Sequence, residues 1–162
     1  MVYILFSLAC LLVVVAVIDI KHGIIPDKIT IPLMITGLVC SLLFPGLHKT
    51  GAVWKSVLYS LLGMVTGGGV LLLFGLLGDW LFKDETLGGG DIKLLAAIGT
   101  FLGCKLILLV LFLSSLIGIV LGLYLLIWRK RRIIPFGPSI AIASVIAMLC
   151  GKEIIEWYLS FY

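Results

Sequence analysis

Charged residues are scarce in this chain. Only 12% of its 162 residues are Asp, Glu, Lys or Arg, whereas 62% are apolar and the mean hydropathy is +1.31. A soluble domain of this length would have about a quarter of its residues charged. The composition therefore excludes an ordinary soluble domain and predicts one membrane-embedded domain over residues 1–162. The net charge of +4 does not indicate a nucleic-acid partner, because the cations form short clusters beside apolar runs, as topology signals do.

The sequence also lacks paired cysteines and a cleavable signal. Without a C-x-x-C pair, zinc and thioredoxin-type redox sites are excluded, and we expect no metal or cofactor. The first 18 residues have neither a basic start nor a small-residue cleavage site, which favours a retained transmembrane helix over a signal peptide. Free cysteines usually behave as small buried hydrophobes, and we expect this of all four: Cys10, Cys40, Cys104 and Cys150.

Long uncharged runs predict an all-α bundle of six transmembrane helices. About 20 apolar residues cross the ~30 Å hydrocarbon layer. The fourth run has only 11 residues, about 16 Å of helix, and is expected to cross with its flanking lysines reaching the interfaces or the bilayer thinning around it. The predicted segments are Met1–Ile18, Ile29–Leu47, about Ala52 to Gly78, Leu94–Cys104, Leu106–Trp128 and Ile133–Gly151.

The basic residues predict the orientation of this bundle. If all six segments cross, three loops on one side carry eight Lys and Arg residues, and the other side carries four. Because the cytoplasmic side carries the excess, the N-terminus is expected outside. Asp19 and Asp91 then lie at the cytoplasmic face of the cell membrane. Residues 152–162 are expected to form a tail, with Trp157 and Tyr158 at the membrane interface.

Asp19 and Asp91 are the leading candidates for a functional site. Ionisable groups at the edge of the hydrocarbon are costly, which makes them functional candidates. Asp91 follows three glycines and can alternatively be an ordinary helix-start residue, whereas Asp19 ends a helix, where the dipole disfavours an anion. Two close carboxylates would share one proton. Such a pair can cut a peptide bond, because one carboxylate activates a water molecule while the other protonates the carbonyl oxygen of that bond.

Other features have structural as well as functional interpretations. Pro26 and Asp27 are expected to begin the second helix, with Asp27 as its cap. The G-x-x-x-G spacings at 63/67 and 118/122 would allow close helix packing, although the signal is weak. Residues 134–138 are expected to form a rigid entry turn or a wall of the site.

The ordered motifs resemble those of the type IV prepilin peptidases over nearly the whole chain. The residues that carry this resemblance are Asp19, Pro26-Asp27, Glu85, Gly88-Gly89-Gly90-Asp91-Ile92-Lys93 and Pro135-Phe136-Gly137-Pro138. The resemblance implies a membrane aspartic endopeptidase that removes the basic leader from prepilins or prepilin-like proteins at the cytoplasmic face. It assigns the catalytic pair to Asp19 and Asp91. Supporting or substrate-binding roles follow for Asp27, Glu85, Gly88, Gly90 and Lys93.

One departure from the larger family members suggests a short form. Those members carry an N-terminal region with paired cysteines and also methylate the new N-terminus; this chain is expected to be a peptidase without that region, S-adenosylmethionine or zinc. The expected partners are a prepilin or pseudopilin, membrane lipid and, in a homo-oligomer, further copies of the chain. The alternatives are a presenilin-like intramembrane protease, which would carry a Pro-Ala-Leu segment absent here, and a small proton-coupled transporter with the aspartates as a relay.

Overall fold

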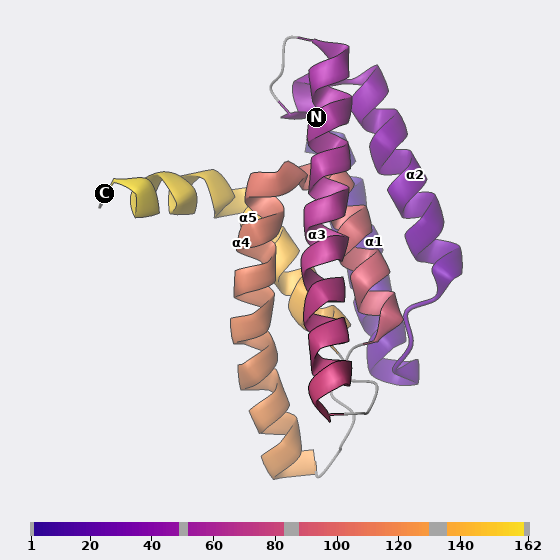
Figure 1. Ribbon diagram of the computed structural model, residues 1–162, viewed down its shortest axis with the longest axis vertical. Helices are drawn as coiled ribbons and strands as arrows, with labels where there is room; N and C mark the ends of the chain where they lie inside the picture. The colour runs from indigo at the N-terminus through magenta and orange to yellow at the C-terminus, as the bar shows by residue number, and fades with distance from the viewer. Residues whose placement is uncertain (1, 49–51, 83–87, 130–135, 161–162) are drawn as a thin grey trace.

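The computed structural model describes residues 2–48, 52–82, 88–129 and 136–160, and within these ranges all regular structure is helical (Figure 1). The elements are α1 (Val2–His22), α2 (Asp27–Leu43), a short 3₁₀ helix η1 (Pro45–His48), α3 (Val53–Phe82), α4 (Gly89–Arg129) and α5 (Gly137–Leu159). The all-α prediction is confirmed. Of the described helices, α1, α3, α4 and α5 are long and apolar enough to cross a membrane, so the six predicted crossings are not established.

The long helix α4 consists of two parts joined at Gly103. This residue has φ 75° and ψ 174°, a backbone conformation that is essentially restricted to glycine. Figure 1 shows the chain reversing direction there, so the parts before and after Gly103 run in opposite directions. The break coincides with the predicted boundary between the fourth and fifth segments, which is why α4 counts as one candidate span where two were expected.

The first part of α4 forms the centre of the bundle. Every residue from Leu94 to Gly103 is buried, and Leu94, Leu95 and Ile98 are completely inaccessible. A helix surrounded by protein does not need to match the lipid thickness, which explains its short length better than the predicted lysine snorkelling. Bilayer thickness constrains the length of helices that contact lipid. The first part of α4 contacts other helices instead.

Small residues on α3 allow its close approach to the first part of α4. A Cβ atom added to Gly63 would collide with the carbonyl oxygen of Gly99, and one added to Gly67 would lie 2.5 Å from the carbonyl oxygen of Leu95. Ser60 Oγ also donates a 2.7 Å hydrogen bond to the carbonyl oxygen of Thr100. The predicted packing role of Gly63 and Gly67 is confirmed.

The spacing at Gly118 and Gly122 has a different explanation. An added Cβ atom at Gly118 would lie 2.6 Å from the ring of Phe136. Gly118 therefore accommodates an aromatic side chain at the entry to α5. The predicted glycine-mediated helix contact is wrong at Gly118.

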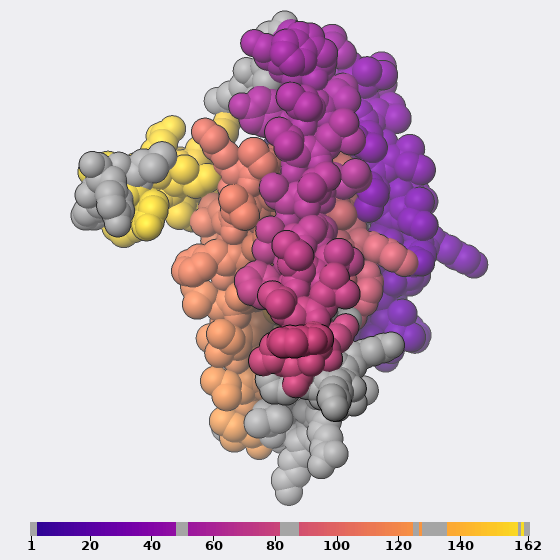
Figure 2. Space-filling model, viewed as in Figure 1, coloured from indigo at the N-terminus to yellow at the C-terminus, as the bar shows by residue number. Residues whose placement is uncertain are grey.

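The helix α5 extends beyond the predicted end of the last segment. It continues to Leu159, so residues 152–159 form helix where a tail was expected. Its C-terminal part projects sideways from the other helices (Figures 1 and 2). Trp157 and Tyr158 on this part are more than 60% exposed, as are Phe6 on α1 and Leu73 on α3. Such apolar surfaces on long helices fit an integral membrane protein.

Candidate active site

Three chain segments that are distant in sequence meet at one end of the bundle. They are the last turn of α1 with Asp19, the first turn of α4 with Asp91, and the N-terminus of α5 with Gly137. Figure 1 shows these helix ends at the same end of the molecule, where α3 also ends. The two predicted aspartates are therefore brought to the same region.

Asp19 is held by the N-terminus of α5. Only 5% of Asp19 is exposed, and its Oδ2 atom accepts a 2.8 Å hydrogen bond from the backbone N–H of Gly137. The positive end of the α5 dipole thus faces an anion that the end of α1 alone would disfavour. α1 terminates just beyond, where Gly23 has φ 66° and donates a 2.7 Å hydrogen bond to the Asp19 carbonyl oxygen.

The fit between Asp19 and α5 leaves no room for a side chain at position 137. An added Cβ atom would lie 2.6 Å from Asp19 Oδ2 and 3.0 Å from Asp19 Cγ. Sequence reasoning did not identify Gly137 as a functional residue, although it singled out the segment around it. The signal was a glycine followed by Pro138 at a helix start, which predicts an entry turn but does not reveal what the turn contacts.

Asp91 lies in the first turn of α4 and is partly buried. Its backbone N–H donates a 3.1 Å hydrogen bond to the carbonyl oxygen of Gly88. The negative charge of Asp19 acts electrostatically on Asp91 across this end of the bundle. Two carboxyl groups in one partly buried site can share a proton and act on a water molecule from two sides.

The three glycines before Asp91 have different surroundings. An added Cβ atom at Gly90 would lie 2.9 Å from Ile25 Cβ, so Gly90 lets the loop between α1 and α2 contact the start of α4. A Cβ atom at Gly88 would lie 3.3 Å from Asp91 Oδ2, whereas one at Gly89 would have nothing within 4 Å. Gly90 is therefore required for a close contact beside Asp91, and Gly88 lies against the Asp91 carboxylate.

Asp27 and Lys93 form an ion pair between the starts of α2 and α4. Lys93 Nζ lies 2.8 Å from Asp27 Oδ1 and 2.7 Å from Asp27 Oδ2, and both side chains are about half exposed. The expected capping role of Asp27 is wrong, because Pro26 occupies the cap position without a side-chain hydrogen bond and Asp27 lies inside the helix. Asp27 instead fixes the start of α2 to the turn of α4 that carries Asp91.

Two other predicted elements fall outside the described residues. Glu85 lies in the segment 83–87 between α3 and α4, and Pro135 lies in the segment 130–135 before α5. Within residues 2–48, 52–82, 88–129 and 136–160, no three His, Cys, Asp or Glu side chains are grouped to hold a metal ion.

Comparison with known proteins defines the class of this molecule. Residues 6–123 match the model of the type IV leader peptidase family. The chain belongs to this family, and the resemblance recognised from its motifs is confirmed.

Several curated relatives share more than a third of their residues with this chain over the matched region. A prepilin leader peptidase/N-methyltransferase of Aeromonas salmonicida is 39% identical over 160 residues, covering 94% of this chain and 51% of the relative. Proteins of the same name from Xanthomonas campestris and Pseudomonas aeruginosa are 38% and 37% identical, over 95% and 93% of this chain and 52% and 50% of those proteins. The chain thus spans about half the length of these relatives. No solved structure matches it significantly.

Proposed function

We propose that this protein is a membrane aspartic endopeptidase that removes the basic leader peptide from type IV prepilins or prepilin-like proteins. The observations that support the proposal are the hydrogen bond that holds Asp19 to the N-terminus of α5 and the electrostatic interaction of Asp91, on α4, with that carboxylate. Membership of the leader peptidase family supports the same activity and favours it over a presenilin-like protease or a proton-coupled transporter.

In the proposed reaction, the two carboxylates share one proton and act on either side of a water molecule. The ionised carboxylate removes a proton from the water as its oxygen attacks the scissile carbonyl carbon. The protonated carboxylate donates its proton to the carbonyl oxygen. As the C–N bond of the tetrahedral intermediate breaks, the leaving nitrogen takes up the proton that the first carboxylate received. The second carboxylate recovers a proton from a hydroxyl of the intermediate, which restores the shared proton.

The chain's own contacts would hold this pair in place. The Gly137 N–H fixes Asp19 Oδ2, and the contact between Gly90 and Ile25 together with the Asp27–Lys93 ion pair fixes the first turn of α4. Such preorganisation matters because small displacements of reacting groups reduce rates strongly. Asp27, Lys93, Gly88 and Gly90 are thus proposed as supporting residues, with Glu85 included on the family motif alone.

We further propose that the helical segments form six membrane crossings. The reversal at Gly103 divides α4 into two, and α2 completes the set with 17 residues. The N-terminus would then be outside and the aspartates at the cytoplasmic face, where a prepilin presents its basic leader. The excess of Lys and Arg in the loops on that side supports this orientation.

Reconstituted protein tests the activity directly. The purified chain in lipid is incubated with a prepilin, and mass spectrometry maps the cleaved bond. Asp19→Asn and Asp91→Asn should each abolish cleavage at unchanged protein levels, because neither variant retains two carboxyl groups. Glu153→Gln, an exposed acid on the projecting part of α5, should leave it intact. Normal leader removal by either aspartate variant would remove the assignment.

A further inference from the structure

The two helices that carry the aspartates are connected through a third helix, α5. The helix α1, with Asp19 in its last turn, packs chiefly against α5, and α5 in turn packs against α4, whose first turn carries Asp91. The N-terminus of α5 also holds the Asp19 carboxylate through the 2.8 Å hydrogen bond from the Gly137 N–H. The position of Asp19 relative to Asp91 therefore depends on where α5 begins against α4.

An aromatic contact fixes the start of α5 to the second part of α4. The ring of Phe136 lies against Gly118, where an added Cβ atom would be 2.6 Å from the ring atom Cε2 and 3.1 Å from Cδ2. Gly118 is buried, and Phe136 packs against the hydrophobic core. Phe136 is also the cap residue of α5, and its carbonyl oxygen accepts a 3.1 Å hydrogen bond from the Ile140 N–H. A displacement of the ring therefore displaces the start of α5, and the Gly137 N–H with it.

We propose that Phe136 and Gly118 are positioning residues of the peptidase. The ring seated against Gly118 sets the place of the Gly137 N–H, and this N–H in turn holds Asp19 at the site. The inference rests on the proposed function, because it concerns the placement of the proposed catalytic pair. Small displacements of reacting groups reduce rates strongly. A methyl group beside the ring should therefore lower the rate although both aspartates are unchanged.

Gly118→Ala should lower kcat for leader cleavage by about tenfold and leave the KM for the prepilin unchanged. The added methyl group forces the Phe136 ring away, which weakens the hydrogen bond between Gly137 and Asp19. A tenfold loss is at the low end for a hydrogen bond to a charged group. In a Gly137→Ala background, Gly118→Ala should lower kcat little further, because both substitutions act on the same contact. Full additivity of the two losses would contradict the proposal.

Phe136→Leu tests the same contact from the side of the ring. Alone, it leaves space beside Gly118 and should lower kcat several-fold, because the start of α5 is then less firmly held. Combined with Gly118→Ala, it exchanges part of the ring for a methyl group, and volume-conserving changes are tolerated best. The double variant should therefore cleave faster than either single variant. A double variant that is not faster than both would overturn the proposal.

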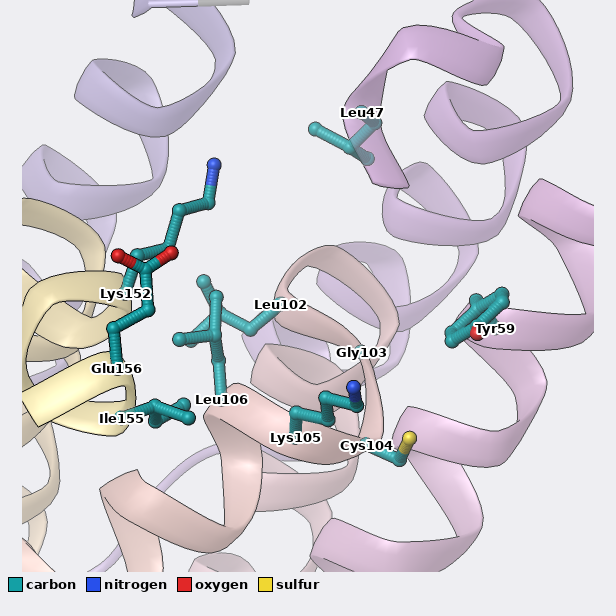
Figure 3. Close-up of a pocket in the computed structure, with 10 residues that line it drawn as sticks. All are labelled: Leu47, Tyr59, Leu102, Gly103, Cys104, Lys105, Leu106, Lys152, Ile155 and Glu156. Atoms are coloured by element: carbon teal, nitrogen blue, oxygen red, sulfur yellow. The ribbon is translucent and has the colours of Figure 1, made fainter. Parts of the chain in front are cut away.

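Gly151→Ala is the matched control at the other end of the contact between α4 and α5. An added Cβ atom at Gly151 would lie 2.7 Å from Leu106 Cδ2, nearly the same overlap as at Gly118. Leu106 borders a pocket of about 330 Å³ that is lined by α4, the C-terminal part of α5, α3 and η1 (Figure 3). About 22 Å of helix separates Gly151 from Phe136. Gly151→Ala should therefore retain the wild-type kcat. An equal loss in Gly118→Ala and Gly151→Ala would reduce the effect to general loosening of the two helices and overturn the proposal.

Hydrogen–deuterium exchange of the purified protein separates this inference from the proposed activity. In Gly118→Ala, the Gly137 amide should exchange about tenfold faster than in the wild type, because its hydrogen bond to Asp19 opens more often. The same amide should exchange at the wild-type rate in Gly151→Ala. A wild-type protein that cleaves no prepilin would defeat the proposed function, and the exchange rates would still show whether the ring holds Gly137 in place. Unchanged exchange or a wild-type kcat in Gly118→Ala would overturn the inference while the proposed function stands.

Discussion

A methyl group at position 137 should disable the proposed peptidase without changing either aspartate. Gly137→Ala places a Cβ atom 2.6 Å from Asp19 Oδ2 and 3.0 Å from Asp19 Cβ and Cγ, all below van der Waals contact. Since Gly137 begins α5, its backbone is constrained by the helix that follows. The Asp19 side chain must therefore rotate away and give up its 2.8 Å hydrogen bond with the Gly137 N–H.

The size of the effect follows from that hydrogen bond. A hydrogen bond to a charged group contributes about 1.5–3 kcal/mol. If its loss lowers the population of correctly placed Asp19 by that free energy, kcat for leader cleavage falls about 10- to 100-fold, because each ~1.4 kcal/mol is a factor of ten. The KM for the prepilin should change little, because the substrate's apolar helix would contact other surfaces.

The assay is leader cleavage by protein reconstituted in lipid, with rates measured at saturating prepilin. Gly89→Ala is the matched control, since it makes the same substitution two residues before Asp91 where an added Cβ meets nothing within 4 Å. It should retain the wild-type rate. Circular dichroism and gel-filtration elution establish that both variants fold. A folded Gly137→Ala variant with wild-type kcat would refute the view that the α5 N-terminus positions Asp19.

Two further predictions concern the contacts around the site and in the bundle. Asp27→Lys should reduce the cleavage rate by a few-fold, because the half-exposed ion pair contributes only about 0.2–1 kcal/mol and two repelling lysines replace it. Adding Lys93→Asp restores a pair of opposite charges and should restore most of the rate. Failure of this rescue would show that the pair has another role. Gly63→Ala should destabilise the protein by about 1–3 kcal/mol, because the added methyl group overpacks against Gly99. Gly69→Ala, whose added Cβ atom has nothing within 4 Å, should be neutral or stabilising. Equal Tm values for the two variants in detergent would contradict this packing.

The sequence predicts the helices and the two acids more readily than it predicts their neighbours. Uncharged runs define membrane-compatible helices because the hydrocarbon layer tolerates few charges. For the same reason, Asp19 and Asp91 stand out. Their partners do not: the N–H of Gly137 is 118 residues from Asp19, and Lys93 is 66 residues from Asp27. Neither contact has a local signal, because a polar group at a helix end can be satisfied by many partners.

The burial of the short fourth segment was missed for a related reason. In a soluble protein, an apolar face marks the side of a helix that packs inward. In a membrane-embedded helix the lipid-facing side is apolar as well. The sequence of residues 94–103 is therefore equally compatible with surrounding lipid and with surrounding protein. The informative signal lies on its neighbour α3, where Ser60, Gly63 and Gly67 recur on one face. Small residues mark close helix packing in membranes, and there they indicate contact with protein.

The position of Asp19 shows how the bundle offsets an electrostatic cost that one helix alone cannot. At the end of α1 this carboxylate faces the negative end of its own helix dipole. The N-terminus of α5 brings a backbone N–H and a positive dipole end to the same carboxylate. Asp91 adds repulsion but lies at the N-terminus of α4, where the dipole favours its charge. In this bundle, two helix N-termini beside the end of a third therefore favour the charges of the two acids, which ties the proposed chemistry to the topology of the bundle.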